Sequence, residues 1–301
     1  MQRRIEDGIA KLRGLREGDV AARDLTACGH AAIGPLADFL RAREPSGIFQ
    51  PRCQAVEILA DLAAKEVLLE FLAHPPASAD PVEQAGVDVV ISAVARALTK
   101  WPDDRLFSLL MQTSSRKLLP GVVDALGQFA RPEAAPVLAA ALAEDFCRSG
   151  AESGFRRLGA EACPQLLQLA RSAVPSREKE TEMSRRRRRS ALRLWGELSR
   201  ETRMVQDIWS LTDDPDNHVA FLACSLCLSH VPPVAVDKVT LRLIDLLERS
   251  EWMLRDDIKD LLATHFSICR PAIQRRLRTA SGATVSALQQ IAQRGRAPRG
   301  Q

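Results

Sequence analysis

The stretch "HAAIGPLADFLRAREPS" at residues 30–46 returns as "AEACPQLLQLARSAVPS" at residues 160–176, at a constant offset of 130 residues. A second stretch, "PRCQAVEILADL" at 51–62, returns as "RRRSALRLWGEL" at 187–198, after an insertion of six residues. Apolar residues in both stretches recur at the spacing of an amphipathic helix. The chain therefore contains a repeated unit of two helices, and internal repeats of this kind are the strongest single indication of the fold.

The composition also indicates a helical protein. Aromatic residues make up 4% of the 301 residues, tyrosine is absent, and Ala, Leu, Arg and Glu dominate. These four residue types are strong helix formers. Apolar helical runs are separated by short breaks such as "PDD" at 102–104 and "DDPDN" at 213–217, which are typical of turns and helix starts. A count of the runs predicts an all-α chain of about nine antiparallel helix pairs, each of about 33 residues.

Three copies of the first helix type read "AIGPL", "AAPVL" and "ACPQL", and three of the second read "RCQAVEILA", "RRSALRLWG" and "LRDDIKDLLA". At these residues the chain resembles the HEAT-repeat family. The resemblance implies helix pairs stacked into a right-handed superhelix, an α-solenoid whose second helices line a concave face. In that family the arginine of the second helix typically pairs with an acid near the preceding turn. This implies a structural role for Arg52, Arg188 and Arg255.

One helix pair cannot bury its apolar faces alone, so neighbouring pairs stack into a continuous core. We therefore expect a single α-solenoid domain over residues 1–294. The basic segment 295–301 lacks apolar residues and is expected to be a disordered tail. No apolar run is long enough to span a membrane. Seven scattered cysteines, an odd number, favour a reducing, cytoplasmic location.

Basic residues are concentrated in two zones of the chain. Residues 261–301 contain seven arginines and no acidic residue, and residues 171–203 contain eleven basic and five acidic residues. Opposite charge attracts partners to such zones. The side chains that we predict to bind an anionic group or a partner are Arg185, Arg186, Arg187, Arg189, Arg193, Arg275, Arg276 and Arg278.

The run "RRRRR" at 185–189 leaves several alternatives open. Five successive residues circle a helix completely, so they cannot all serve one surface. Arg188 aligns with Arg52 and takes the structural position of the repeat. The other four could bind an anionic partner, pair with acids of neighbouring repeats as a solvated face, or form a nuclear targeting signal.

Candidate chemistry is sparse. The segment "CSLCLSH" at 224–230 offers Cys224, Cys227 and His230 as weak zinc-ligand candidates, but strong zinc motifs contain a second pair of ligands. Both cysteines are expected to pack in a helix core, and we predict neither a metal nor another cofactor. The sequence contains no GxSxG, no Walker loop and no GxGxxG, so no small-molecule substrate is indicated.

We therefore expect a non-enzymatic scaffold or adaptor that binds another protein through its concave face and its arginine patch. The alternative is a nucleic-acid-binding solenoid. Some HEAT-like proteins are DNA glycosylases with a cleft lined by Trp and Asp, and four tryptophans are available here, Trp101, Trp195, Trp209 and Trp252. No catalytic motif of those enzymes can be matched to this chain, and Trp195 occupies a core position of the repeat.

Overall fold

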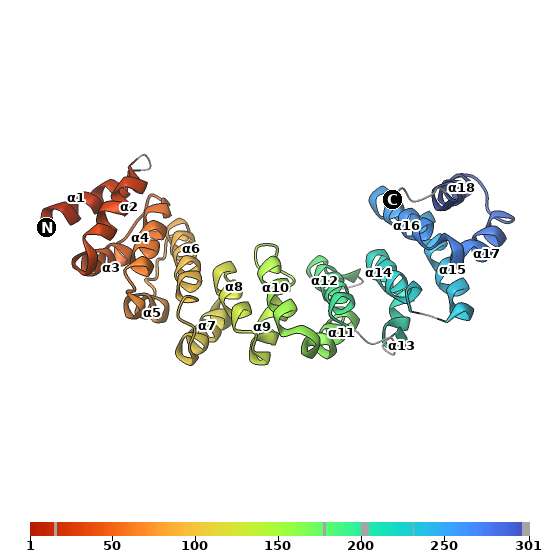
Figure 1. Ribbon diagram of the computed structural model, residues 1–301, viewed down its shortest axis with the longest axis horizontal. Coiled ribbons are helices and arrows are strands. Elements are labelled where there is room, and N and C mark those ends of the chain that lie inside the picture. Colours follow the sequence, from red (N-terminus) through yellow and green to blue (C-terminus); the bar gives the residue numbers. More distant parts are fainter. Residues whose placement is uncertain (15–16, 177–178, 200–204, 231, 297–301) are drawn as a thin grey trace. The chain divides into compact units, whose positions relative to one another are not determined.

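The computed structural model describes residues 1–14, 17–176, 179–199, 205–230 and 232–296. The chain consists of helices that pack mainly on their neighbours along the sequence (Figure 1). Contacts divide it into two compact units, Met1–Leu158 and Gly159–Gln301. The all-α prediction is thus confirmed at the level of secondary structure. None of the described helices combines the length and the apolar composition that crossing a membrane requires.

The N-terminal unit contains ten α-helices and two short 3-10 helices among its described residues. The α-helices are α1 (Gln2–Leu12), α2 (Gly18–Ala27), α3 (Ile33–Arg41), α4 (Gln50–Asp61), α5 (Lys65–Ala73), α6 (Pro81–Leu98), α7 (Asp104–Arg116), α8 (Pro120–Phe129), α9 (Ala135–Ala141) and α10 (Arg148–Leu158). The 3-10 helices are Gly29–Ala32 and Pro132–Ala134.

Helix starts in this unit follow local chemistry. Proline occupies the first turn of α4, α6 and α8, where its missing N–H leaves no hydrogen bond unmade. Asp80 and Asp103 cap α6 and α7 by accepting hydrogen bonds from the N–H groups of Val82 and Leu106, at 2.9 and 2.7 Å. Such caps satisfy backbone donors that have no partner within the helix.

Helices α6 and α8 approach each other closely at a glycine. Gly121 lies in the first turn of α8, and a Cβ atom placed there would lie 2.0 Å from the carbonyl oxygen of Ser92 on α6. No side chain can occupy that space without moving one of the two helices, because the atom it would meet belongs to the backbone. The packing distance between α6 and α8 therefore depends on glycine at this position.

The C-terminal unit continues the helical pattern and adds one hairpin. Its α-helices are α11 (Cys163–Arg171), α12 (Glu182–Leu198), α13 (Val205–Ile208), α14 (Asn217–Leu228), α15 (Pro233–Arg249), α16 (Trp252–Thr264), α17 (Phe266–Leu277) and α18 (Ala283–Arg296). Its 3-10 helices are Gly159–Ala162 and Trp209–Asp213, and its two strands are β1 (Pro175–Ser176) and β2 (Lys179–Glu180).

Key apolar positions of the two sequence copies are buried in both units. Leu36 and its counterpart Leu166 are fully buried, as are Ala55 and its counterpart Ala191. Trp195, which replaces the leucine of the first copy, is also buried. The predicted tail begins inside α18, which extends to Arg296, and residues 297–301 lie outside the described part of the chain.

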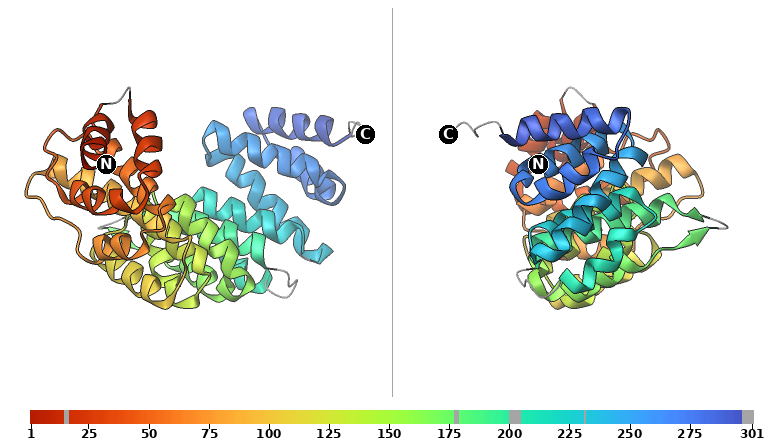
Figure 2. Two further views of the ribbon diagram at one scale, coloured as in Figure 1. Left: turned by 60° about the vertical axis from the view of Figure 1, so that its left-hand side comes forward. Right: turned by 90° about the vertical axis from the view of Figure 1, so that its right-hand side faces the viewer.

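The antiparallel pair β1–β2 was not expected from the sequence. Pro175 pairs with Glu180 and Ser176 with Lys179, and Figure 2 shows the two strands as green arrows. The hairpin lies between α11 and α12, where the second sequence copy carries its six-residue insertion. A pair of two-residue strands is too short to produce a recognisable alternation of apolar and polar residues.

Candidate functional site

The five arginines of the run lie on the first half of α12 and occupy different environments. The Arg188 side chain is 2% exposed, whereas those of Arg185, Arg186 and Arg189 are 40, 39 and 28% exposed. Ser184 and Ser190, which flank the run, are buried. One face of the helix therefore enters the core within the run itself.

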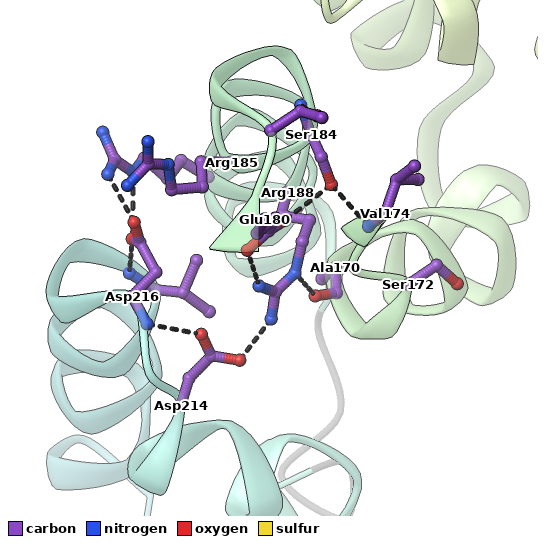
Figure 3. A network of polar contacts seen from close by, with 12 residues as sticks. Ala170, Ser172, Val174, Glu180, Ser184, Arg185, Arg188, Asp214 and Asp216 are labelled. Carbon is purple, nitrogen blue, oxygen red and sulfur yellow. Dashed lines mark hydrogen bonds and ion pairs between the residues drawn. The ribbon is translucent and has the colours of Figure 1, made fainter. Parts of the chain in front are cut away.

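Arg188 is the centre of a buried network of polar contacts (Figure 3). Its Nε donates to the carbonyl oxygen of Ala170 at 2.7 Å, and its Nη1 lies 2.8 Å from Oε2 of Glu180. Its Nη2 donates to a carboxylate oxygen of Asp214. These acceptors belong to the end of α11, to the hairpin and to the turn before α14, so one side chain joins three segments.

Burial and pairing act in opposite directions on Arg188. Removing a guanidinium from water disfavours its charged form, but the hydrogen bond and the charge of Asp214, together with Glu180, outweigh that effect and raise the pKa of Arg188. A buried ion pair of this kind contributes little net stability relative to an apolar replacement of the whole cluster. Loss of one partner, however, leaves the others charged and buried.

Ser184 orders the hairpin around this network. Its hydroxyl donates to Oε1 of Glu180 and accepts a hydrogen bond from the N–H of Val174 at 2.9 Å. Thr181 caps α12 by accepting from the N–H of Ser184 at 3.2 Å. One carboxylate oxygen of Glu180 thus accepts from Ser184 while the other contacts Arg188.

Arg189 extends the network to the start of α14. Its Nε donates to Oδ1 of Asp216 at 3.0 Å. Asp216 also caps α14, accepting from the N–H groups of His218 and Val219 at 3.1 and 3.0 Å, and its own N–H donates to Asp214 at 2.9 Å. Burial raises the pKa of Asp216, but the hydrogen bonds from Arg189 and from the N–H of Val219 outweigh this effect, so the net pKa is lowered.

The other arginines of the run also have partners within the unit. Arg185 and Arg186 contact opposite oxygens of Glu182, at 3.0 and 3.1 Å, and Arg187 donates to the carbonyl oxygen of Ser172 at 3.0 Å. Arg193 lies exposed further along α12. The predicted patch is therefore largely matched by acceptors of its own unit.

Arg185 and Arg189 nevertheless line a groove of about 730 Å³ at the N-terminal ends of α12, α14 and α16. Its basic side chains are Lys179, Arg185 and Arg189. Its acidic side chains are Glu180, Glu182, Asp216 and Glu251. His218 also lines it, with Nε2 3.5 Å from Glu251. Charges of both signs line this groove, so it does not resemble a binding site for anions alone.

Large apolar side chains are exposed on residues that are adjacent in sequence to the groove lining but do not belong to it. Trp252 and Met253 directly follow Glu251 in the first turn of α16 and are 73 and 60% exposed, and Met183 in the first turn of α12 is 55% exposed. Trp252 is not among the residues that the sequence predicts to bind a partner. The signal was present, because Leu254, Ile258 and Leu262 form the buried stripe of α16 and Trp252 falls outside it.

The predicted C-terminal arginines lie elsewhere, at the end of α17. Arg275 pairs with Asp237, and Arg276 lies 3.3 Å from both Asp245 and Glu248. Arg278 is exposed. None of the three lines the groove of Arg185 and Arg189, and Arg276 lines a second groove of the same unit. The two sets of arginines therefore do not converge on one site.

The three predicted repeat arginines differ from one another. Arg52 is buried like Arg188, with 3% of its surface exposed, but its Nε and Nη2 have no hydrogen-bond partner among the described residues. Arg255 is exposed on α16 and does not have the buried environment that the resemblance implied. The sequence supplies a reason: no acidic residue follows position 260, so no carboxylate stands at the 26-residue spacing that separates Asp214 from Arg188.

The cysteine segment packs in the core. Cys224 and Cys227 are buried, and burial is the main cause that raises their pKa values to about 12 and about 11. A raised pKa disfavours the thiolate form that binds metals. His230 is exposed, and its Nδ1 lies 3.0 Å from the carbonyl oxygen of Leu226. Among the described residues, no three potential metal ligands of the His, Cys, Asp and Glu types lie together.

No protein-family model matches the chain, and no curated protein matches its sequence.

Proposed function

We propose that this protein is a non-enzymatic scaffold that binds another protein at the groove of the C-terminal unit. The observation that carries the proposal is the exposure of Trp252 and Met253, which stand in sequence between Glu251 and Leu254, two residues that line the groove of Arg185 and Arg189. Exposed apolar side chains next to polar ones are typical of interaction sites. Trp, Met and Arg are also enriched at protein interfaces, and Trp and Arg supply much of their binding energy.

The pairing of the arginines favours a protein partner over a nucleic acid. Binding to a phosphate backbone depends on cations that neutralise phosphates and release counterions. Arg185, Arg188 and Arg189 already contact carboxylates of their own unit, and so do Arg275 and Arg276. A protein surface with charges of both signs is the better complement to a groove that is lined by both acidic and basic side chains.

We further propose that the helix pairs form a HEAT-like α-solenoid. The aligned sequence copies and the packing of each helix on its chain neighbours support this. In a solenoid a local disturbance spreads mainly to adjacent repeats. Gly121→Ala should therefore raise amide hydrogen exchange in α6 and α8 and leave α15–α18 unchanged. An equal rise along the whole chain would contradict a solenoid.

The binding proposal is tested with Trp252→Ser combined with Met253→Ser. The matched control is Phe146→Ser, because Phe146 is 89% exposed in the N-terminal unit. A partner enriched from the source organism with the wild type and with the control should be lost with the double variant. With purified partner, we expect a cost of about 2 kcal/mol or more, roughly thirtyfold in Kd. Equal affinity of the double variant and the control would refute the groove as the binding site.

The nucleic-acid alternative is tested by titrating salt against binding to duplex DNA. Tight binding at low salt that falls steeply with salt concentration would support that alternative over ours. We expect weak binding with a shallow dependence, unchanged by Arg185→Ala.

A further inference from the structure

The C-terminal unit contains a second groove, also of about 730 Å³, that differs from the first in its charge. It lies between the end of α15, the first half of α16, the end of α17 and the start of α18. Three cations line it, Arg255, Lys259 and Arg276, and the acid in its lining is Glu248. Its lining therefore contains more cations than acids, unlike that of the first groove, although Asp256 and Asp245, outside the lining, pair with Lys259 and Arg276.

The cations of this second groove retain unused hydrogen-bond donors. The side chain of Arg255 has no hydrogen-bond or ion-pair partner within the described part of the chain. Lys259 contacts one oxygen of Asp256 at 3.0 Å, although a lysine has three donors. Arg276 makes both of its ion pairs, each of 3.3 Å, through Nη2, and its buried Nε has no partner in the described residues.

Hydroxyl groups complete the lining. Thr284 donates to Oε1 of Glu248 at 3.1 Å and so takes up part of the charge of that carboxylate. Ser281 and Ser286 are exposed and line the groove from the loop before α18 and from α18 itself. Guanidinium and ammonium groups together with hydroxyls are the donors that bind phosphate oxygens.

We propose that this second groove binds a phosphate monoester. A monoester carries a charge of about −1.5 to −2 near neutral pH and three acceptor oxygens. Arg255 supplies a positive charge that no carboxylate contacts within the described residues, and Lys259 and Arg276 supply the donors that their contacts with Asp256, Asp245 and Glu248 leave unused. The monoester could belong to a phosphorylated side chain of the partner in the proposed function or to a small phosphorylated molecule. The site itself rests on its own residues and not on the groove beside Trp252.

The direct test measures binding of inorganic phosphate and of O-phosphoserine at constant ionic strength. Wild-type protein should bind both saturably, and Arg255→Ala should weaken binding about tenfold, the value of one charge-assisted hydrogen bond. Arg278→Ala is the matched control, since Arg278 is an exposed arginine on the same unit that does not line the groove. Because Arg255 is exposed and has no partner in the part of the chain that the structure describes, circular dichroism should show both variants folded.

Three further measurements separate the sources and the proposals. A phosphoserine peptide that binds more tightly than O-phosphoserine identifies a protein ligand, and equal affinity indicates a small molecule. Trp252→Ser with Met253→Ser should bind phosphate like the wild type, so failure of the scaffold proposal leaves this one standing. The proposal is overturned if wild type shows no saturable binding of phosphate, or if Arg255→Ala binds phosphate as tightly as wild type. It is also overturned if duplex DNA binds more tightly than monoesters and Arg255→Ala weakens that binding.

Discussion

Arg52 and Arg188 occupy equivalent positions in two aligned helices, and both are buried, but only Arg188 is surrounded by acceptors. Helices α6 and α14, which follow them, begin 136 residues apart, so Ser78 falls on the position of Asp214. The N-terminal copy thus has a neutral residue where the C-terminal copy has a carboxylate. The same arginine is satisfied in one unit, while two of its nitrogen atoms have no partner in the described part of the other.

We expect Arg188→Met to lower the free energy of unfolding by about 3–5 kcal/mol. The substitution leaves Glu180 and Asp214 charged and buried without their cation. Urea denaturation followed by circular dichroism measures the loss. A change below about 1 kcal/mol would show that water reaches the two carboxylates and solvates them.

Arg52→Met should have the opposite effect. Removing a buried charge that has no partner among the described residues relieves its desolvation cost. The free energy of unfolding should therefore stay constant or rise by up to about 4 kcal/mol, and the urea midpoint should rise with it. The same urea titration compares the two variants directly. A loss as large as that of Arg188→Met would mean that Arg52 has a strong partner in solution.

Gly121→Ala should destabilise the N-terminal unit by about 1–3 kcal/mol or more, because overpacking forces helices apart. Gly34→Ala is the matched control. Gly34 is also the second residue of its helix, α3, but a Cβ atom there has no other atom within 4 Å. It should stabilise by up to about 1 kcal/mol, the helix propensity gained over glycine. Equal effects of the two substitutions on the thermal midpoint would rule out the close approach of α6 and α8.

Glu83, at the start of α6, should make stability depend on pH. A hydrogen bond from Ser78, then those from Arg43 and from the N–H of Glu44, lower its pKa from 4.5 to about 2. Since the folded pKa lies below the unfolded one, ionised Glu83 stabilises the protein above about pH 4.5. This contribution is lost as the pH falls toward about 2.

The measurement compares wild type and Glu83→Gln by urea denaturation across this range. The stability difference should be largest at neutral pH and should shrink progressively below pH 4.5. Glu66→Gln serves as control, because Glu66 forms an exposed ion pair with Arg105, and exposed pairs contribute little. A difference for Glu83→Gln that stays constant with pH would contradict the lowered pKa.

The helical architecture could be predicted from the sequence, but the pairing of its charges could not. The spacing of Leu36, Ala55 and Leu59 shows which helix faces are buried, because burial follows helical periodicity. The acceptors of Arg188 lie 8, 18 and 26 residues away in the chain. Which acid reaches which arginine depends on how three segments meet, and periodicity carries no information about that.

The proposed binding surfaces are hard to predict from the sequence for the same reason. The density of basic residues along the chain predicts a binding site at Arg185–Arg189, yet most of these arginines pair with carboxylates of their own unit. The structure makes Trp252 and Arg255 binding candidates through their exposure, and Arg255 also through its lack of a partner among the described residues. The type of a residue at a helix start does not by itself determine whether its side chain faces a neighbouring helix or solvent.

The hairpin limits how the two copies of the repeat can exchange sequence. Glu180 lies in the segment 177–186, which is six residues longer than its counterpart 47–50, whereas the arginine that it contacts belongs to the common repeat. Deleting the hairpin would leave Arg188 without the Glu180 carboxylate, and copying α12 alone into the first repeat would bring neither Glu180 nor Asp214 with it. Arg52 shows the cost of separating the two, because the same buried arginine without a hairpin has two nitrogen atoms with no partner among the described residues. Moving Arg188 with all its acceptors therefore requires the end of α11, the hairpin, α12 and the turn before α14 to move as one unit.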